Sequence, residues 1–428
     1  MVSARISITG LGHEGEGVGR VDGIATFIPG ALPGETVLVN IKEKKKSFQR
    51  GSLEEILEPS RERIAAPCHV YEECGGCQLQ HMDYNASLVW KKQRVEDALE
   101  RIGKLSGVKV RLVLGMQDQW RYRNKVQLQA GEINGKLELG YYSKKSNRLV
   151  PFNDCLLISP LFNSIRAYLV NFFNENRISK ANLDQVIIRY SPQTMEVMLG
   201  FVGTLPKLSW ESVKKEFPQI KSIVAVNPKS RGVQVLLGAG TIRDQIFGNQ
   251  FTLSLQSFSQ VNPAQTEVLY AKTLEYAELT GTEAVVDAYC GIGTITLALA
   301  RKAKSAIGVE VVEQAVRDAK ENAKLNNINN VEFYAAPTEK ILPELAEKGL
   351  KADVVVLDPP RSGCEKAALE AIVTINPKRI IYVSCDPATL ARDLGFLQEK
   401  GYQTLEVQPV DMFPWTAHVE CVALIERI

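Results

Sequence analysis

The fold of this chain is decided by the stretch Asp287-Ala288-Tyr289-Cys290-Gly291-Ile292-Gly293-Thr294. It joins an apolar run at residues 284–288 to a helical apolar pattern at residues 294–302. Gly291 and Gly293 let the backbone turn tightly and let a ligand approach it closely. Thr296 occupies the place of the third glycine of the dinucleotide pattern G-x-G-x-x-G. The stretch therefore predicts a nucleoside site between a first strand and a first helix, with weak support for a dinucleotide.

Working outward, apolar runs and helical patterns alternate through residues 251–428. We expect further strands at 306–310, 331–335, 353–357, 379–384, 403–410 and 419–425. This rhythm predicts a doubly wound, mainly parallel α/β sheet with an antiparallel end. Glu310 ends the second strand, where a carboxylate can accept hydrogen bonds from both ribose hydroxyls of a nucleoside. Together with the motifs below, Glu310 favours S-adenosylmethionine over NAD.

Two polar motifs follow neighbouring strands of the predicted sheet. Asp358-Pro359-Pro360-Arg361 comes after the fourth strand, at the edge where ligands bind in such sheets. An aromatic residue after Asp-Pro-Pro is typical of amine methylation, so Arg361 indicates a different acceptor. Ser384-Cys385-Asp386-Pro387 comes after the fifth strand. A cysteine at a strand tip can be exposed, with the lowered pKa that a nucleophile requires, although a lone cysteine is more often a small buried apolar residue.

Glu420 begins the last apolar strand. A carboxylate among apolar residues has a raised pKa, which suits a general base. The alternatives are a carboxylate facing water at the start of a strand or a buried partner for an arginine.

The first part of the chain has a different character. Residues 1–58 read as short strands with glycine-rich turns, which predicts a small barrel of the oligonucleotide-binding type. Three cysteines then fall within ten residues: Cys68, Cys74 and Cys77. Three thiolates so close can bind zinc or an iron–sulfur cluster. The nearest candidate for a fourth ligand is Cys155, and His69 or His81 would suit zinc.

Charge and composition narrow the classes of partner. The chain has 51 Lys and Arg against 49 Asp and Glu, but residues 84–148 hold 14 against 6. Residues 84–102 predict one helix with Lys91 and Arg94 on its polar face, and residues 120–125 interleave aromatics with cations. Such patterns suit a polyanion and base stacking, with a solvated surface or an edge strand as alternatives. No apolar run reaches the about 18 residues of a membrane span, and residues 1–5 lack the core of a signal peptide, so we expect a cytoplasmic protein.

These residues together resemble the RNA uracil-5 methyltransferase family, whose members modify 23S ribosomal RNA or tRNA. The resemblance covers nearly the whole chain and implies a TRAM domain for the barrel and a [4Fe-4S] cluster on Cys68, Cys74, Cys77 and Cys155. Phe258-Ser259-Gln260-Val261-Asn262 is similar to the family's F-x-Q-x-N motif. The resemblance implies cofactor contacts for Gln260, Tyr289, Glu310 and Asp358, with Cys385 as nucleophile and Glu420 as base. Thr294 and residues 336–339 depart from the family pattern.

The resemblance also implies a domain division and a reaction. We expect a TRAM-like barrel at 1–58, a mixed α+β central domain with the cysteine cluster at 59–250, and a Rossmann-like class I methyltransferase domain at 251–428. A thiolate attacks carbon 6 of uracil, carbon 5 accepts a methyl group, and a base removes the carbon 5 proton. We expect 23S ribosomal RNA as the partner of a monomer without membrane contact.

Three alternatives stay open at this point. The first is a tRNA uracil-5 methyltransferase. The second is an RNA cytosine-5 methyltransferase, which commonly has a second cysteine in the Asp-Pro-Pro loop, whereas Cys364 lies at a different place. The third, ranked last, is a non-enzymatic RNA-binding iron–sulfur scaffold, since it leaves Cys385 and Glu420 without a role.

Overall fold

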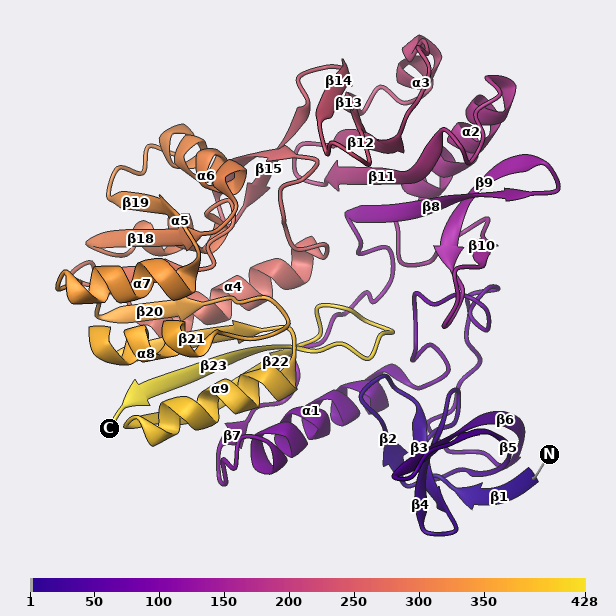
Figure 1. Ribbon diagram of the computed structural model, residues 1–428, viewed down its shortest axis with the longest axis horizontal. Helices are drawn as coiled ribbons and strands as arrows, with labels where there is room; N and C mark the ends of the chain where they lie inside the picture. Colours follow the sequence, from indigo (N-terminus) through magenta and orange to yellow (C-terminus); the bar gives the residue numbers. More distant parts are fainter. Residues whose placement is uncertain (1–2) are drawn as a thin grey trace.

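The computed structural model describes residues 3–428 and arranges them in four β-sheets. Figure 1 shows three groups of elements: a small all-β group at the N-terminus, an upper mixed group, and a large α/β group that contains the C-terminus. The first two residues of the segment that we examined for a signal peptide, 1–5, lie outside the described residues. Between residues 3 and 428, no helix combines the length and apolar character needed to cross a membrane.

The N-terminal group is a single sheet of six short strands in the order β1-β5-β6-β4-β3-β2. Its strands are β1 (Ser3–Ser7), β2 (Gly10–Leu11), β3 (Gly17–Val21), β4 (Ile24–Ile28), β5 (Thr36–Lys44) and β6 (Phe48–Glu58). Ile6, Ile28, Val37 and Val39 are buried inside it, because alternate residues of each strand point to one face. The expected series of short strands with glycine turns is therefore confirmed, and we call this sheet the barrel.

A seven-stranded sheet follows in the order β10-β9-β8-β11-β12-β13-β14. Its elements are β8 (Lys125–Ile133), β9 (Lys136–Tyr142), β10 (Leu149–Pro151), α2 (Pro160–Glu175), β11 (Leu183–Ser191), β12 (Glu196–Gly203), α3 (Glu211–Glu216), β13 (Ile220–Val226) and β14 (Val233–Leu237). Helix α2 packs its apolar face, including Phe162 and Phe173, against this sheet. The hairpin of β15 (Thr241–Ile246) and β16 (Asn249–Ser254) then leads into the C-terminal part.

The C-terminal sheet has eight strands in the order β19-β18-β17-β20-β21-β23-β22-β7. Its strands are β7 (Lys109–Val110), β17 (Ala284–Ala288), β18 (Ser305–Glu310), β19 (Val331–Ala335), β20 (Val354–Leu357), β21 (Arg379–Ser384), β22 (Tyr402–Val410) and β23 (Glu420–Arg427). The five strands β17 to β21 are parallel, and β23 is antiparallel to β21. The predicted doubly wound sheet with an antiparallel end is confirmed.

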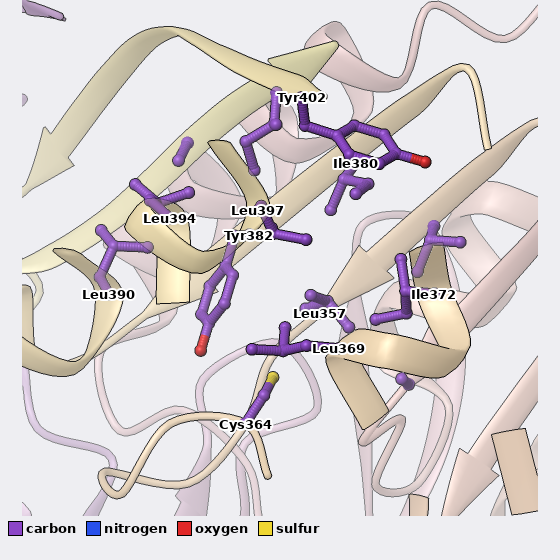
Figure 2. Close-up of a cluster of buried hydrophobic side chains, with 14 of the residues drawn as sticks. Leu357, Cys364, Leu369, Ile372, Ile380, Tyr382, Leu390, Leu394, Leu397 and Tyr402 are labelled. Carbon is purple, nitrogen blue, oxygen red and sulfur yellow. The ribbon is translucent and has the colours of Figure 1, made fainter. Parts of the chain in front are cut away.

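Helices cover both faces of this sheet. They are α4 (Pro263–Ala277), α5 (Thr294–Ala300), α6 (Glu313–Leu325), α7 (Thr338–Glu347), α8 (Lys366–Ile375) and α9 (Pro387–Glu399). Figure 2 shows the cluster under α8 and α9, where Leu369, Leu390 and Leu394 pack with Tyr382. Cys364 lies at the edge of this cluster and is buried, as expected for a packing residue.

Residues 84–110 pack with the C-terminal sheet although they precede the middle sheet in the chain. Helix α1 (Tyr84–Arg101), which agrees with the helix predicted at 84–102, lies beside α9 (Figure 1). Strand β7 pairs in parallel with β22, with Lys109 opposite Glu406. Lys91 is fully buried and ion-paired with Asp411, so its expected place on the polar face was wrong. The spacing Leu88–Lys91–Val95, three and then four residues, is the sequence signal that places Lys91 on the packed face.

Candidate active site

Three predicted site residues lie at neighbouring strand ends. Asp358 follows β20, Cys385 follows β21, and Glu420 begins β23. These strands are adjacent in the sheet, and because β23 runs antiparallel, its first residue lies at the edge where β20 and β21 end. Ser384 pairs with Cys421 across β21 and β23, which sets Cys385 beside Glu420. The fold therefore brings a thiol and two carboxylates together at one sheet edge.

Both carboxylates favour the protonated form. Glu420 is 3% exposed, and its burial, reinforced by nearby Asp358, raises its pKa to about 8. Desolvation of the Asp358 carboxyl raises its pKa to about 7. The predicted raised pKa of Glu420 is confirmed, because the side chain lies in an apolar setting without a hydrogen-bonding cation. Arg361 opposes this shift from the rim of the site.

The thiol of Cys385 departs from the expectation of a lowered pKa. Cys385 is half-buried, and burial together with the charges of Glu420 and Asp358 raises its pKa to about 11. The predicted lowered pKa was wrong, because burial of the thiol disfavours the thiolate, and the two neighbouring carboxyl groups add to this effect. Arg361 acts in the opposite direction.

Arg361 and His418 face each other at the rim. The Nη2 atom of Arg361 lies 3.4 Å from Nε2 of His418. Burial and the surrounding cations lower the pKa of His418 to about 4, so the imidazole is neutral and can accept a hydrogen bond. The neutral ring thus orients a guanidinium at the same cleft that Cys385 lines.

The predicted nucleoside site is a second part of the same sheet edge. The Glu310 carboxylate accepts hydrogen bonds from the backbone N–H groups of Gly291, at 3.1 Å, and Val312, at 2.8 Å. Gly293 has a φ of 85° and directly precedes α5. Tyr289 also has a positive φ, of 70°, which costs roughly 1–3 kcal/mol in a residue with a Cβ. Such a strained turn at the end of β17 is held by its surroundings and fits a ligand-binding loop.

Gln260 lies in the segment that directly precedes α4. It lines a small cavity of about 20 Å³ with Asn124, Asp244 and Thr266. Its segment is fixed by buried Arg189, which donates hydrogen bonds to Ser259 Oγ and to backbone carbonyls. The lining of this small cavity does not include Cys385, so the cofactor contact of Gln260 stays a prediction.

The four predicted cluster cysteines come together. Cys68, Cys74, Cys77 and Cys155 line one cavity of about 160 Å³. Across residues 3–428, no three His, Cys, Asp or Glu side chains are placed to hold a single metal ion. Neither His69 nor His81 is among the residues that line this cavity. The cavity offers four sulfurs around a space, an arrangement that suits a polynuclear group better than one ion.

A wide cleft connects the barrel, the cysteine segment and the strand ends. Its volume is about 1340 Å³, and Cys385 lies in its lining. Its lining holds seven cations and five carboxylates, and one of the cations, Arg50, is ion-paired with Glu16. The cations are Lys42, Arg50, Arg63, Arg94, Lys144, Lys145 and Arg361, and the carboxylates are Glu14, Glu16, Glu43, Glu72 and Asp386. Arg94 and the two lysines come from the basic stretch 84–148, so part of that stretch does face one shared cleft. The cleft therefore offers a polyanion a path to the thiol.

The aromatic residues at 120–125 are packed inside and do not face this cleft. The Trp120 ring stacks on Trp415 with centroids 4.6 Å apart, and the Tyr122 hydroxyl donates to the Pro414 carbonyl at 3.2 Å. Arg121 forms an ion pair with Asp154. The predicted base stacking by Trp120 and Tyr122 was wrong, because these side chains support the loop of residues 411–419 between β22 and β23. The pattern of 120–125 alone could not identify that partner segment, which follows about 300 residues later in the chain.

Comparison with known proteins assigns the family. Residues 83–428 match the model of the tRNA (uracil-5-)-methyltransferase family, and residues 4–53 match the TRAM domain. The chain belongs to the tRNA (uracil-5-)-methyltransferase family. It is 46% identical to an uncharacterized RNA methyltransferase of Halalkalibacterium halodurans, over 98% of this chain and 96% of the relative. An uncharacterized RNA methyltransferase of Caldanaerobacter subterraneus subsp. tengcongensis is 45% identical, over 99% of this chain and 98% of the relative.

A solved structure supports the same assignment over the whole chain. The Pyrococcus abyssi tRNA (uracil-54, C5)-methyltransferase, solved in complex with S-adenosyl-L-homocysteine, superposes with a TM-score of 0.80 at 26% identity. The match covers 99% of this chain and 100% of that one. This member of the family is therefore an RNA methyltransferase with a TRAM domain and an α/β methyltransferase fold.

Proposed function

We propose that this enzyme methylates carbon 5 of uracil in RNA with S-adenosylmethionine, through a covalent bond between Cys385 and carbon 6 of the base. The observation that carries the proposal is the placement of Cys385, which lines the cleft, beside buried Glu420 on the adjacent strand end. Glu310, Tyr289 and Asp358 are the proposed cofactor contacts beside them. S-adenosylmethionine supplies the methyl group when bound.

The chain's own groups account for the proton and electron movements on uracil. The Cys385 thiolate attacks carbon 6, and the charge delocalises onto carbon 5, which becomes nucleophilic. After carbon 5 has been methylated, Glu420 removes its remaining proton, and the thiolate leaves as the ring double bond re-forms. The raised pKa makes the Glu420 carboxylate a stronger base than an ordinary carboxylate once it has lost its own proton, and this form becomes more populated as the pH rises toward 8. The target base must leave its stack to reach the cleft floor.

We further propose that Cys68, Cys74, Cys77 and Cys155 hold a [4Fe-4S] cluster. The cavity between the four sulfurs supports this fit, and the chemistry on uracil needs no electron transfer. The cluster would then act in structure or RNA binding. Anaerobically purified protein is expected to be brown and to contain iron, and zinc without iron would contradict the assignment.

We propose that the enzyme is a cytoplasmic monomer and that its substrate is 23S ribosomal RNA. The proposed division into 1–58, 59–250 and 251–428 assigns the barrel and the central domain to RNA binding, although residues 84–110 of the central range pack with the C-terminal sheet. A second candidate, tRNA, is favoured by the full-length match to the Pyrococcus abyssi tRNA enzyme, which includes its barrel-like part. Methylation of both RNAs in vitro, followed by nucleoside analysis, separates the two, and 5-methylcytidine would identify the cytosine alternative.

The covalent mechanism is tested by two variants at the strand ends. Cys385→Ala is expected to abolish both methylation and covalent RNA complexes, because carbon 5 is never activated. Glu420→Gln is expected to form a methylated RNA–protein complex that survives denaturing electrophoresis, because elimination slows by roughly 100- to 10,000-fold. A complex with both variants would exclude Cys385 as the nucleophile. Normal turnover of Glu420→Gln would assign the base to another group, with His418 as the nearest candidate in sequence.

A further inference from the structure

The segment that follows the cysteine motif is bonded directly to the 411–419 loop. The backbone N–H groups of Gln78 and Leu79 both donate to the carbonyl of Trp415, each at 3.0 Å. The Oε1 atom of Gln78 accepts a hydrogen bond from the N–H of Ala417 at 3.4 Å. Ala417 lies three residues before Glu420, so these bonds restrain the part of the loop that leads into the base.

Gln78 also connects this loop back to the cysteine motif. Its Nε2 donates to the carbonyl of Gly75 at 3.1 Å, and its own carbonyl accepts a hydrogen bond from the Tyr71 hydroxyl at 2.7 Å. Gln78 directly follows Cys77, and the apolar cluster around Cys77 contains Tyr71 and Trp415. Whatever the four cysteines hold therefore also restrains the loop.

The barrel also lies against Gln78, Leu79 and the 411–419 loop. A Cβ on Gly15 would lie 3.1 Å from Leu79, 3.5 Å from Gln78 and 3.6 Å from Ala417. One short segment thus contacts all three parts of the enzyme. Figure 1 shows the loop between β22 and β23 extending from the C-terminal sheet toward these N-terminal segments.

The Trp415 backbone explains why the loop needs such support. Trp415 has a φ of 67°, a conformation that a bulky residue adopts only when its surroundings hold it. Two N–H donors on its carbonyl, the stack on Trp120 and a hydrogen bond from its Nε1 to the Gln119 carbonyl fix this geometry. Pairing with β21 and β22 fixes β23 from Glu420 onward, and the donors of Gln78 and Leu79 restrain the loop that leads into it.

We propose that Gln78 is a positioning residue for the general base: it holds the 411–419 loop so that Glu420 reaches the carbon 5 proton. This inference rests on the proposed function. It predicts a defect in elimination and leaves thiolate attack intact, because Cys385 is carried by β21 and not by this loop.

The test compares Gln78→Met, which keeps the size of the side chain and removes its amide, with Gln49→Met. Gln49 is a buried barrel glutamine whose Nε2 donates to the Val21 carbonyl, outside the cleft lining. With the unmodified form of the RNA that the wild-type enzyme methylates, Gln78→Met is expected to turn over at least about tenfold more slowly and to accumulate the methylated covalent complex. S-adenosylmethionine affinity is expected to stay within about twofold of wild type. Gln78→Glu keeps an acceptor for the Ala417 N–H and is expected to restore part of the rate.

Several results would overturn the inference. Equal turnover of Gln78→Met and Gln49→Met would overturn it. A parallel loss of turnover and of the covalent RNA–protein complex in Gln78→Met would also overturn it, because it indicates general damage to the protein. A wild-type enzyme that makes no 5-methyluridine would instead contradict the proposed function. Hydrogen exchange of the wild-type protein provides a readout that needs no variant: the amides of Gln78, Leu79 and Ala417 are expected to exchange slowly and together, and rapid exchange of these amides excludes the restraint.

Discussion

Glu420 and Cys385 lie close enough at the sheet edge that the charge of the Glu420 carboxylate raises the pKa of the Cys385 thiol. The pKa of Glu420 is raised to about 8 by burial, and the pKa of Cys385 is raised to about 11 by burial and the two neighbouring carboxylates. A proton on Glu420 lowers the cost of the thiolate, whereas the later step needs Glu420 unprotonated. The site therefore suits a reaction in which the base acts after the nucleophile.

The raised pKa of Glu420 predicts a pH-dependent stability. Its folded-state pKa of about 8 lies above the ordinary value of 4.5, so its contribution to stability is complete below pH 4.5 and is lost as the pH rises through 8. Glu420→Gln removes this loss, and we expect it to stabilise the protein at pH 9 by roughly 2–4 kcal/mol with little change near pH 4.5. Thermal unfolding at both pH values checks the prediction. Glu321→Gln, at an exposed position of α6, serves as the control. The same change in the free energy of unfolding at both pH values for Glu420→Gln would contradict the prediction.

At the scale of elements, α1 is attached to the methyltransferase sheet by one buried ion pair. Lys91 and Asp411 are both fully buried, and the Tyr84 hydroxyl donates a second hydrogen bond to the Asp411 carboxylate at 2.8 Å. Lys91 also donates to the Phe413 carbonyl at 3.3 Å. This network fixes the start of the 411–419 loop, while Gln78 restrains its other end.

Removing one partner of this pair is expected to be costly. Lys91→Met leaves the Asp411 charge buried and should lower the free energy of unfolding by roughly 3–5 kcal/mol. The double variant Lys91→Met/Asp411→Leu should recover much of that loss, because apolar residues of similar volume can replace a buried pair. Urea denaturation measures both effects. Lys92→Met, which loses a half-exposed pair with Glu96, is the control and should cost less than about 1 kcal/mol; an equal cost for the two lysines would refute the assigned role.

Sequence patterns predicted elements better than they predicted contacts between them. The strand at residues 284–288 and the helix at 84–102 follow from periodicity, which is a local property. The meeting of Asp358 and Cys385 followed from strand order in a parallel sheet, whereas the place of Glu420 beside them depends on the antiparallel pairing of β23 with β21. The roles of Trp120 and Lys91 could not be predicted, because each depends on a partner in the distant 411–419 loop. The raised pKa of Cys385 was missed for a related reason: it depends on the placement of two carboxylates from other strands.

At the scale of the whole molecule, the cleft combines cations from all three parts. Arg50 comes from the barrel, Lys144 from the loop after β9, and Arg361 from the end of β20. A single-stranded polyanion in this cleft would contact every part at once, which suits recognition of an unpaired RNA segment.

The cations of the cleft predict an RNA affinity that falls with salt, with each cation contributing a part of that dependence. Arg50→Ala and Lys144→Ala should each weaken RNA binding and reduce the slope of log K against log salt by roughly 0.7–1, through loss of one phosphate contact. Fluorescence anisotropy at several salt concentrations measures the slope. Arg317→Ala, an exposed cation of α6 outside the cleft lining, should leave affinity and slope unchanged. Unchanged slopes for both cleft variants would place the RNA elsewhere.

The pairing of β7 with β22, and of Lys91 with Asp411, also determines when the fold can be completed during synthesis. These contacts join residues about 300 positions apart, so Glu406 and Asp411 are made long after α1. On the ribosome, α1 has no surface to dock on until residues 406–411 have emerged. Its exposed apolar face is then open to chaperones or to aggregation. A premature stop shortly before residue 406 should therefore leave α1 undocked as well as remove Glu420, the proposed base.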